Sequence, residues 1–74
     1  MNGDVKLTPA NATDGVIYST GDVNLNGNKL TLNNITLIVT GNLNGGGTVV
    51  TRGNGALCVE GNVQNNPDLS KATV

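Results

Sequence analysis

The chain of 74 residues contains no histidine, no tryptophan and no phenylalanine, and its only cysteine is Cys58. Without histidine, an enzyme lacks the commonest general acid–base group and the commonest metal ligand. A single cysteine cannot form an internal disulfide, which excludes a small domain held together by disulfides. We therefore expect no enzymatic activity and no bound metal or cofactor.

Charged and aromatic side chains are also scarce. Four basic and five acidic residues give a net charge of −1, so no basic stripe is available to follow a phosphate backbone. Tyr18 is the only ring that could stack on a base. Apolar clusters such as residues 37–39 are far shorter than the core of a signal peptide or a membrane span. The composition argues against nucleic acid as a partner and against membrane insertion.

What the chain does contain is an internal repeat. The motif Gly-Asp/Asn-Val/Leu-Asn/Gln begins at Gly21, Gly41 and Gly61, so it returns at every twentieth position. A related copy begins at Gly3, closer to Gly21 than this period requires, so the first unit is expected to be two residues shorter than the others. Each full copy follows an apolar segment, and these segments are residues 16–20, 36–40 and 56–60.

The repeat favours one of two β architectures. Alternating apolar residues on both sides of Asn26-Gly27 are typical of an antiparallel hairpin. A fixed period favours parallel coils instead, because each side chain of a solenoid stacks on its equivalent in the next coil. We predict a single all-β domain, a right-handed parallel β-solenoid (β-helix) of about three and a half coils of 18–20 residues. The expected coils are residues 1–20, 21–40, 41–60 and 61–74.

The same register predicts which apolar side chains stack in the core. Residues at one offset of the repeat are expected to form columns about 4.8 Å apart along the stack. The sequence does not decide the structure of the C-terminal segment, because Asn66-Pro67-Asp68 fits the start of a short helix and a further coil equally well. The predicted columns are Ile17–Leu37–Leu57, Val39–Val59, Val23–Leu43–Val63 and Leu30–Val50, with Val5 and Leu7 beneath Val23 and Leu25.

Strand alternation predicts an apolar stripe on the outside of the solenoid. With Leu37 and its equivalents inside, Tyr18, Ile38 and Cys58 point outward, flanked by Val16 and Ala56. The stripe has two interpretations: ordinary scattered surface residues or a register error of one residue, and an interface with another subunit or segment. The ends of the stack expose unpaired strand edges, which also favours a homo-oligomer or contact with a neighbouring domain.

Threonine columns form the candidate ligand face. The repeat places Thr31 above Thr51 and Thr20 above Thr40, which would give rows of hydroxyl groups on the surface. Such rows predict a second function, a carbohydrate- or surface-binding module that uses Thr and Asn rows on one solenoid face.

The acidic residues do not predict a metal site. Asp4 and Asp22 occupy equivalent corner positions in the repeat, and Asp14 and Asp68 lie in turns, where an Asp usually accepts a hydrogen bond from its own backbone. The glycine-aspartate nonapeptide of calcium-binding β-rolls is absent, since Gly45-Gly46-Gly47 is followed by no Asp at the required place. We interpret these residues as parts of corners.

The Gly-Asp/Asn-Val/Leu corner, together with Ile35 and residues 37–45, resembles the repetitive β-solenoid segments of bacterial surface and pilus-associated proteins. Less closely, it resembles the polymer-forming bactofilins. The resemblance extends over about residues 15–64. Similarity to the surface proteins implies a stalk or display scaffold at the cell surface or outside the cell. Similarity to bactofilins implies end-to-end filaments in the cytoplasm or at a membrane.

These observations predict a non-enzymatic structural module that stacks on itself or on the rest of a longer surface protein.

Overall fold

The computed structural model describes all residues from 1 to 74 and consists of short strands joined by turns and loops. None of its segments is a helix with the length and apolar character needed to cross a membrane. The ten strands are β1 (Val5–Leu7), β2 (Val16–Ser19), β3 (Val23–Asn24), β4 (Lys29–Asn33), β5 (Thr36–Val39), β6 (Leu43–Asn44), β7 (Thr48–Arg52), β8 (Ala56–Val59), β9 (Val63–Gln64) and β10 (Asp68–Lys71).

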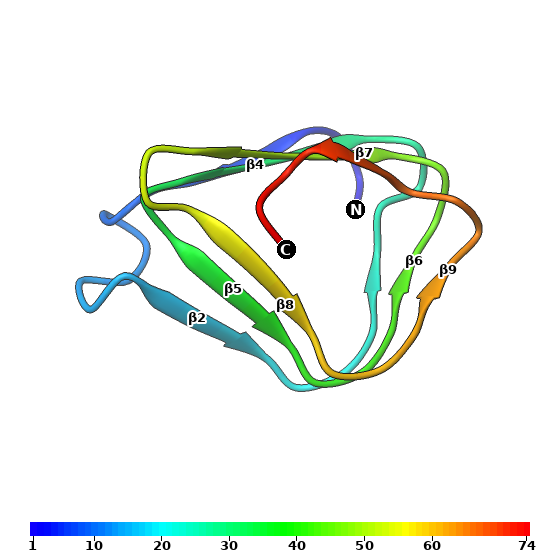
Figure 1. Cartoon of the computed structure of the whole chain (residues 1–74), viewed down its shortest axis with the longest axis horizontal. Helices are drawn as coiled ribbons and strands as arrows, with labels where there is room; N and C mark the ends of the chain where they lie inside the picture. The colour runs from blue at the N-terminus through cyan, green and yellow to red at the C-terminus, as the bar shows by residue number, and fades with distance from the viewer.

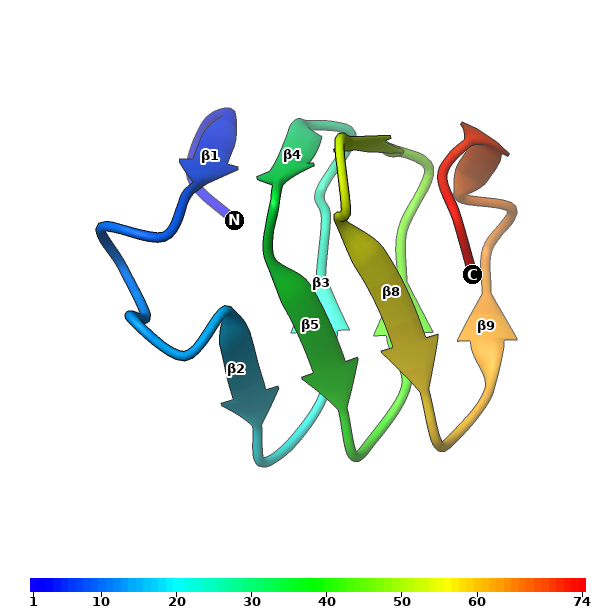
Figure 2. The same cartoon turned by 60° about the vertical axis from the view of Figure 1, so that its left-hand side comes forward.

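The strands form three parallel sheets, which are the three walls of a solenoid of about three coils. Sheet A has the order β1-β4-β7-β10, sheet B the order β2-β5-β8, and sheet C the order β3-β6-β9. Viewed down the stack, the three walls enclose a triangle (Figure 1). In Figure 2 the chain descends along β5 and β8 at the front, rises along β6 behind them, and advances from the N-terminal to the C-terminal end, which is a right-handed winding. The predicted parallel β-solenoid is confirmed.

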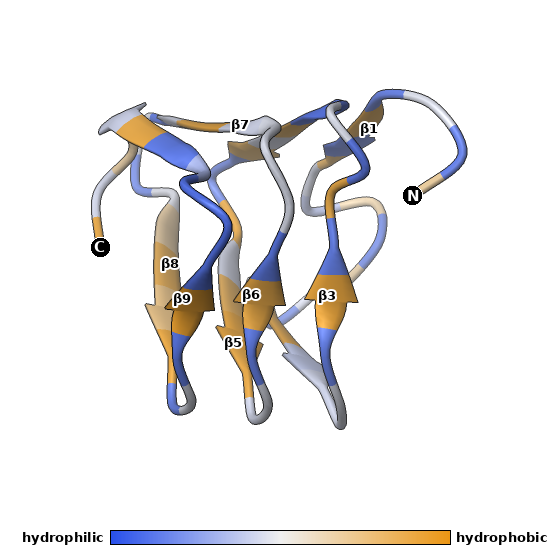
Figure 3. Cartoon of the chain, turned by 90° about the vertical axis from the view of Figure 1, so that its right-hand side faces the viewer, coloured by the Kyte–Doolittle hydropathy of each residue, from blue (hydrophilic) through white to orange (hydrophobic).

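Three of the predicted core columns are also confirmed. Sheet B aligns Ile17 with Leu37 and Leu37 with Leu57, and it aligns Val39 with Val59. Sheet C aligns Val23, Leu43 and Val63, which form an apolar band across its three strands in Figure 3. The nine buried residues of the core are Leu25, Leu30, Leu32, Ile35, Leu37, Val39, Leu43, Val49 and Leu57.

The predicted column of Leu30 and Val50 is wrong, because sheet A aligns Leu30 with Val49, one position short of the period. The corner before β7 has three residues where the corner before β4 has four. Leu25 explains the difference: its side chain is fully buried at the earlier corner. The later corner passes over it with Gly47, where a Cβ atom would lie only 2.8 Å from that of Leu25.

The predicted position of the first strand is also wrong. Val5 and Leu7 lie beside Leu30 and Leu32 of sheet A, not beneath Val23 and Leu25 of the second coil. The first coil is therefore longer than the others, not shorter, since more of the chain separates Val5 from Leu30 than Leu30 from Val49. The extra residues lie in the loop of residues 8–15, which projects from the stack between β1 and β2 (Figure 2). The match between the motif at Gly3 and the motif at Gly21 predicted the wrong position for β1. The inserted loop lies between these motifs and does not alter either of them.

The Asn26-Gly27 turn forms, but it does not make a hairpin. Both residues have positive φ, 51° and 76°, and the N–H of Asn28 donates to the carbonyl of Leu25 at 2.9 Å. The strands on either side belong to different walls, since β3 is in sheet C and β4 is in sheet A. The turn therefore makes a corner of the solenoid.

The C-terminal segment continues the solenoid and contains no helix. β10 pairs with β7 as the fourth strand of sheet A, with an irregularity between Asp68 and Lys71. After it, residues 72–74 turn inward across the end of the stack (Figure 1). The N–H of Leu57 donates to the carbonyl of Thr73 at 2.8 Å, and the N–H of Thr73 donates to Thr51 Oγ1 at 2.8 Å. Of the two alternatives for this segment, the further coil is confirmed.

Candidate functional site

The Gly-Asp/Asn motif of the repeat builds a hydrogen-bonded corner between sheets B and C. Asp22 Oδ1 accepts a hydrogen bond from the backbone N–H of Asn42 at 2.8 Å, and Asn42 Oδ1 accepts one from the N–H of Asn62 at 2.8 Å. Each of these side chains thus bonds the backbone of the next coil, whereas Asp14 and Asp68 bond the backbone N–H two residues on, as expected of turns. Asp4 Oδ1 likewise accepts from the N–H of Lys29 at 2.8 Å. These side chains hold coils together, so the motif is structural.

The apolar stripe lies where the sequence predicts it. Sheet B aligns Tyr18 with Ile38 and Ile38 with Cys58, on the face opposite the core. Tyr18 is 67% exposed and Cys58 is exposed, whereas Ile38 is half-buried between them. Val16 and Ala56 are half-buried at the ends of the neighbouring column. The five predicted interface residues therefore share one side of the solenoid.

The C-terminal end of the stack has a more open surface at β9. This strand pairs with β6 on one side and with nothing on the other. Val63, the last member of its core column, is 47% exposed, whereas Leu43 in the coil below is fully buried. The neighbouring β8 is better covered, because residues 72–74 cross that part of the end and Leu69 and Ala72 pack on the core.

The N-terminal end is covered more completely. Met1, Leu7 and Ala12 pack against the buried core. The backbone nitrogen of Met1 donates to the carbonyl of Asn24 at 2.5 Å, and Asn28 Nδ2 donates to the carbonyl of Met1 at 2.9 Å. The two ends of the solenoid therefore differ, and the open strand edge at β9 belongs to the C-terminal end.

The predicted pairing of Thr31 with Thr51 is wrong. Thr31 aligns with Val50 and lies on the outer face of sheet A, whereas Thr51 aligns with the buried Leu32. The shift of one residue at the preceding corner causes this, because a slip of one residue turns a side chain to the opposite face. Thr51 instead holds the C-terminal segment through its hydrogen bond with Thr73.

The second predicted threonine pair lies at a corner. Thr20 and Thr40 are both exposed, directly after β2 and β5. Thr40 Oγ1 donates to the carbonyl of Ser19 at 3.0 Å, so its hydroxyl bonds to the backbone of the coil below. Neither threonine pair forms the free, flat row of hydroxyl groups that the ligand-face hypothesis requires.

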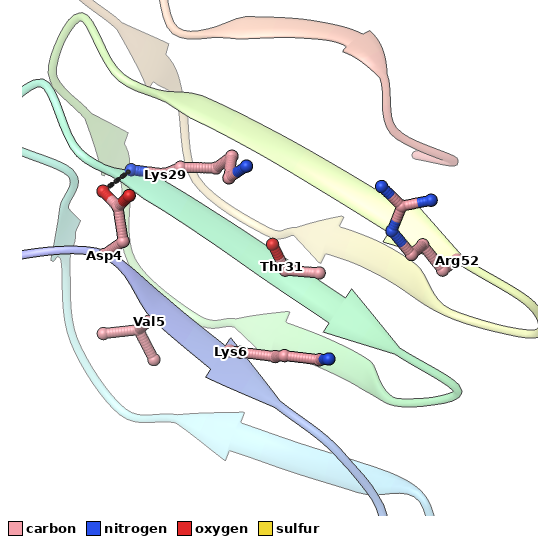
Figure 4. Close-up of a pocket in the computed structure, with 6 residues that line it drawn as sticks. All are labelled: Asp4, Val5, Lys6, Lys29, Thr31 and Arg52. Atoms are coloured by element: carbon pink, nitrogen blue, oxygen red, sulfur yellow. Dashed lines mark hydrogen bonds between the residues drawn. The ribbon is translucent and has the colours of Figure 1, made fainter.

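Sequence reasoning missed a basic hollow on the outer face of sheet A. It measures about 340 Å³ and is lined by Asp4, Val5, Lys6, Lys29, Thr31 and Arg52. Figure 4 shows Thr31 in the middle, with the three basic side chains around it and Asp4 turned toward the backbone of Lys29. The available signal was that each strand of sheet A carries one basic residue, but that pattern appears only once the strands are assigned correctly.

Local hydrogen bonds within β10 set the ionisation of Asp68. A hydrogen bond from the Ser70 hydroxyl, a second from the Ser70 backbone N–H and the nearby charge of Lys71 hold the pKa of this carboxyl below its ordinary value. Asp68 is thereby an ionised acceptor that shapes the turn within β10. The structure contains no group of three or more His, Cys, Asp or Glu residues placed to hold a metal ion.

Comparison with known proteins yields no match, whether with family models, with curated proteins or with solved structures. The function is therefore inferred from the surfaces of the protein alone.

Proposed function

We propose that the protein is a non-enzymatic structural and assembly module that is extended by strand addition at its C-terminal end. The added strand belongs to a second copy of the chain or to the next part of a longer surface protein. The unpaired edge of β9, with Val63 exposed beside it, is the observation that carries this proposal. An unpaired strand next to exposed apolar surface is a template for pairing with another strand.

Two features support association at this end. The core column of Val23, Leu43 and Val63 stops at the end face, so an added coil would bury Val63 as Leu43 is already buried. In addition, β9 itself carries no charged residue that would oppose strand pairing, since the nearby Glu60 lies before the strand begins. The apolar stripe of Tyr18, Ile38 and Cys58 offers a second, lateral contact surface on sheet B.

Sedimentation velocity over a wide range of protein concentrations tests the proposal. We expect the unmodified chain to associate as its concentration rises, and Val63→Lys to remain monomeric because its charge lies in the apolar column that an added coil would bury. Gln64→Lys is the matched control: it adds the same charge to β9, on the outward column of Asn24 and Asn44, and should associate normally.

A clean monomer at every concentration would overturn self-association. If Tyr18→Ser abolishes association and Val63→Lys does not, the lateral stripe is the contact surface and strand addition at β9 is wrong.

A further inference from the structure

The four basic residues of the protein all belong to one wall of the solenoid. Each strand of sheet A contributes one of them, and all four side chains are exposed. Three of the five acidic residues, Asp14, Asp22 and Glu60, lie outside this sheet. A protein with a net charge of −1 therefore carries its positive charge on a single face. The four basic residues and their strands are Lys6 on β1, Lys29 on β4, Arg52 on β7 and Lys71 on β10.

Three of these residues surround Thr31. Lys6 lies beside Thr31 on the neighbouring strand, and Lys29 lies two residues before it on the same face of β4. Arg52 lies two residues beyond Val50, which flanks Thr31 on the other side. Strand spacing and rise place the backbone positions of Lys6 and Lys29 about 8 Å apart. Long flexible side chains at this spacing reach anionic groups carried by one ligand.

The nearest carboxylate does not satisfy these cations. Asp4 Oδ1 accepts its hydrogen bond from the backbone N–H of Lys29 and not from a basic side chain. Figure 4 shows the side chains of Lys6 and Lys29 extending away from Asp4, along the face toward Thr31 and Arg52. The charged ends thus face the open hollow.

The remaining side chains of this face indicate the class of ligand. Thr31, Asn33 and Thr48 supply hydroxyl and amide groups among the cations, and Val50 is the apolar residue between them. Tyr18, the single aromatic residue, lies on sheet B, so this face has no ring on which a base could stack. Hydroxyl and amide groups beside separated cations suit a sugar polymer that carries carboxylate or sulfate groups, since charge-assisted hydrogen bonds are the strong contacts to such groups.

We propose that the outer face of sheet A binds an acidic polysaccharide. Lys6, Lys29 and Arg52 contact its carboxylate or sulfate groups, and the Thr31 hydroxyl contacts the sugar between them. Arg52 presents the planar fork that pairs with both oxygens of a carboxylate. The site lies on a different wall from the apolar stripe and away from the β9 edge, so it does not depend on the assembly role proposed above.

Binding of polygalacturonate and of heparin fragments, with neutral dextran as reference, tests this inference at low and at high NaCl concentration. We expect an acidic polymer to bind at low salt, to weaken as salt screens the charges, and dextran not to bind. The stronger of the two polymers identifies carboxylate or sulfate as the preferred group. The triple variant Lys6→Gln, Lys29→Gln, Arg52→Gln should lose affinity at least roughly tenfold, because exposed ion pairs contribute modestly but add up.

Gln64→Glu is the matched control, since it lowers the net charge by the same one unit on β9, which belongs to another wall of the solenoid. It should change the affinity by less than about twofold, whereas Lys29→Gln and Arg52→Gln should each lower it about three- to fivefold. NMR amide shifts on binding should centre on β1, β4 and β7. Equal losses in all three single variants, shifts centred on sheet B, or binding to neither acidic polymer would overturn the proposal. Tighter binding to a thymidine oligonucleotide or to phosphatidylglycerol vesicles would also overturn it.

Discussion

Gly41 shows how closely the coils approach at the corner between sheets B and C. Its φ is not positive, so its role is not the conformational freedom that corners are expected to need. A Cβ atom at this position would overlap Asp22 Oδ1 and would lie 2.7 Å from the carbonyl carbon of Gly21. The glycine leaves the space in which the Asp22 side chain reaches the N–H of Asn42. The Gly-Asp/Asn motif thus supplies both the hydrogen-bond acceptor and, through the glycine of the next coil, the space for it.

Two members of this glycine column provide a matched test. Gly41→Ala forces the corner apart, and overpacking of this kind lowers the free energy of unfolding by about 1–3 kcal/mol. Gly21→Ala adds the same methyl group at the end of the column, where nothing lies within 4 Å, and should cost less than about 0.5 kcal/mol. Urea denaturation monitored by circular dichroism measures both values. Equal destabilisation by the two substitutions would contradict this account.

The sequence predicted the individual strands better than the register, that is, which residues of neighbouring strands align. Sheets B and C follow the period of the sequence repeat, and for these the columns through Leu37 and Leu43 were predicted correctly. Sheet A departs from it because Leu25 fills its corner with a side chain, whereas the next corner is built from three glycines. The position of Thr51 and the basic hollow depend on that sheet, so sequence periodicity alone could not place them. Packing at the corners sets these offsets.

The C-terminal segment covers part of the end of the stack, and the Thr51 hydroxyl is one of the groups that hold it there. Thr51→Val keeps the size of the side chain and removes the acceptor for the N–H of Thr73. We expect the segment to open more often and the Leu57 amide, which bonds to Thr73, to exchange its hydrogen about fivefold faster, as the loss of one hydrogen bond implies. Thr48→Val changes the same residue type on the outer face of β7 and should leave this exchange rate unaltered. Unchanged exchange at Leu57 in Thr51→Val would show that the segment is held by Leu69 and Ala72 instead.

At the scale of the whole molecule, each coil packs only against its neighbours. All strand pairs join adjacent coils, so the stability of the solenoid is approximately a sum over coils and their interfaces. A solenoid of this kind should accept an additional coil without a change in the others. The register of sheet B defines where such a coil would fit, because Thr36 and Ala56 are equivalent positions.

Duplication of residues 36–55, inserted between Gly55 and Ala56, should give a solenoid one coil longer. Solution scattering should then show the stack lengthened by about 4.8 Å. The dependence of unfolding on urea concentration should also steepen, because more surface is exposed on unfolding. The same insertion lacking Leu37 is the control, since loss of one strand residue turns the following side chains to the wrong face. If the complete duplicate remains disordered by NMR, packing between nearest neighbours is not sufficient for this fold.

The hydrogen bonds between coils run along the stack, and the two termini lie at its opposite ends (Figure 2). A mechanical load applied through the termini would therefore pull directly along these bonds and open them one coil at a time. Each released coil would lengthen the chain by up to roughly 70 Å, the fully extended reach of its residues. A longer solenoid of such coils would extend in steps under load and recover by rewinding onto the coils that remain.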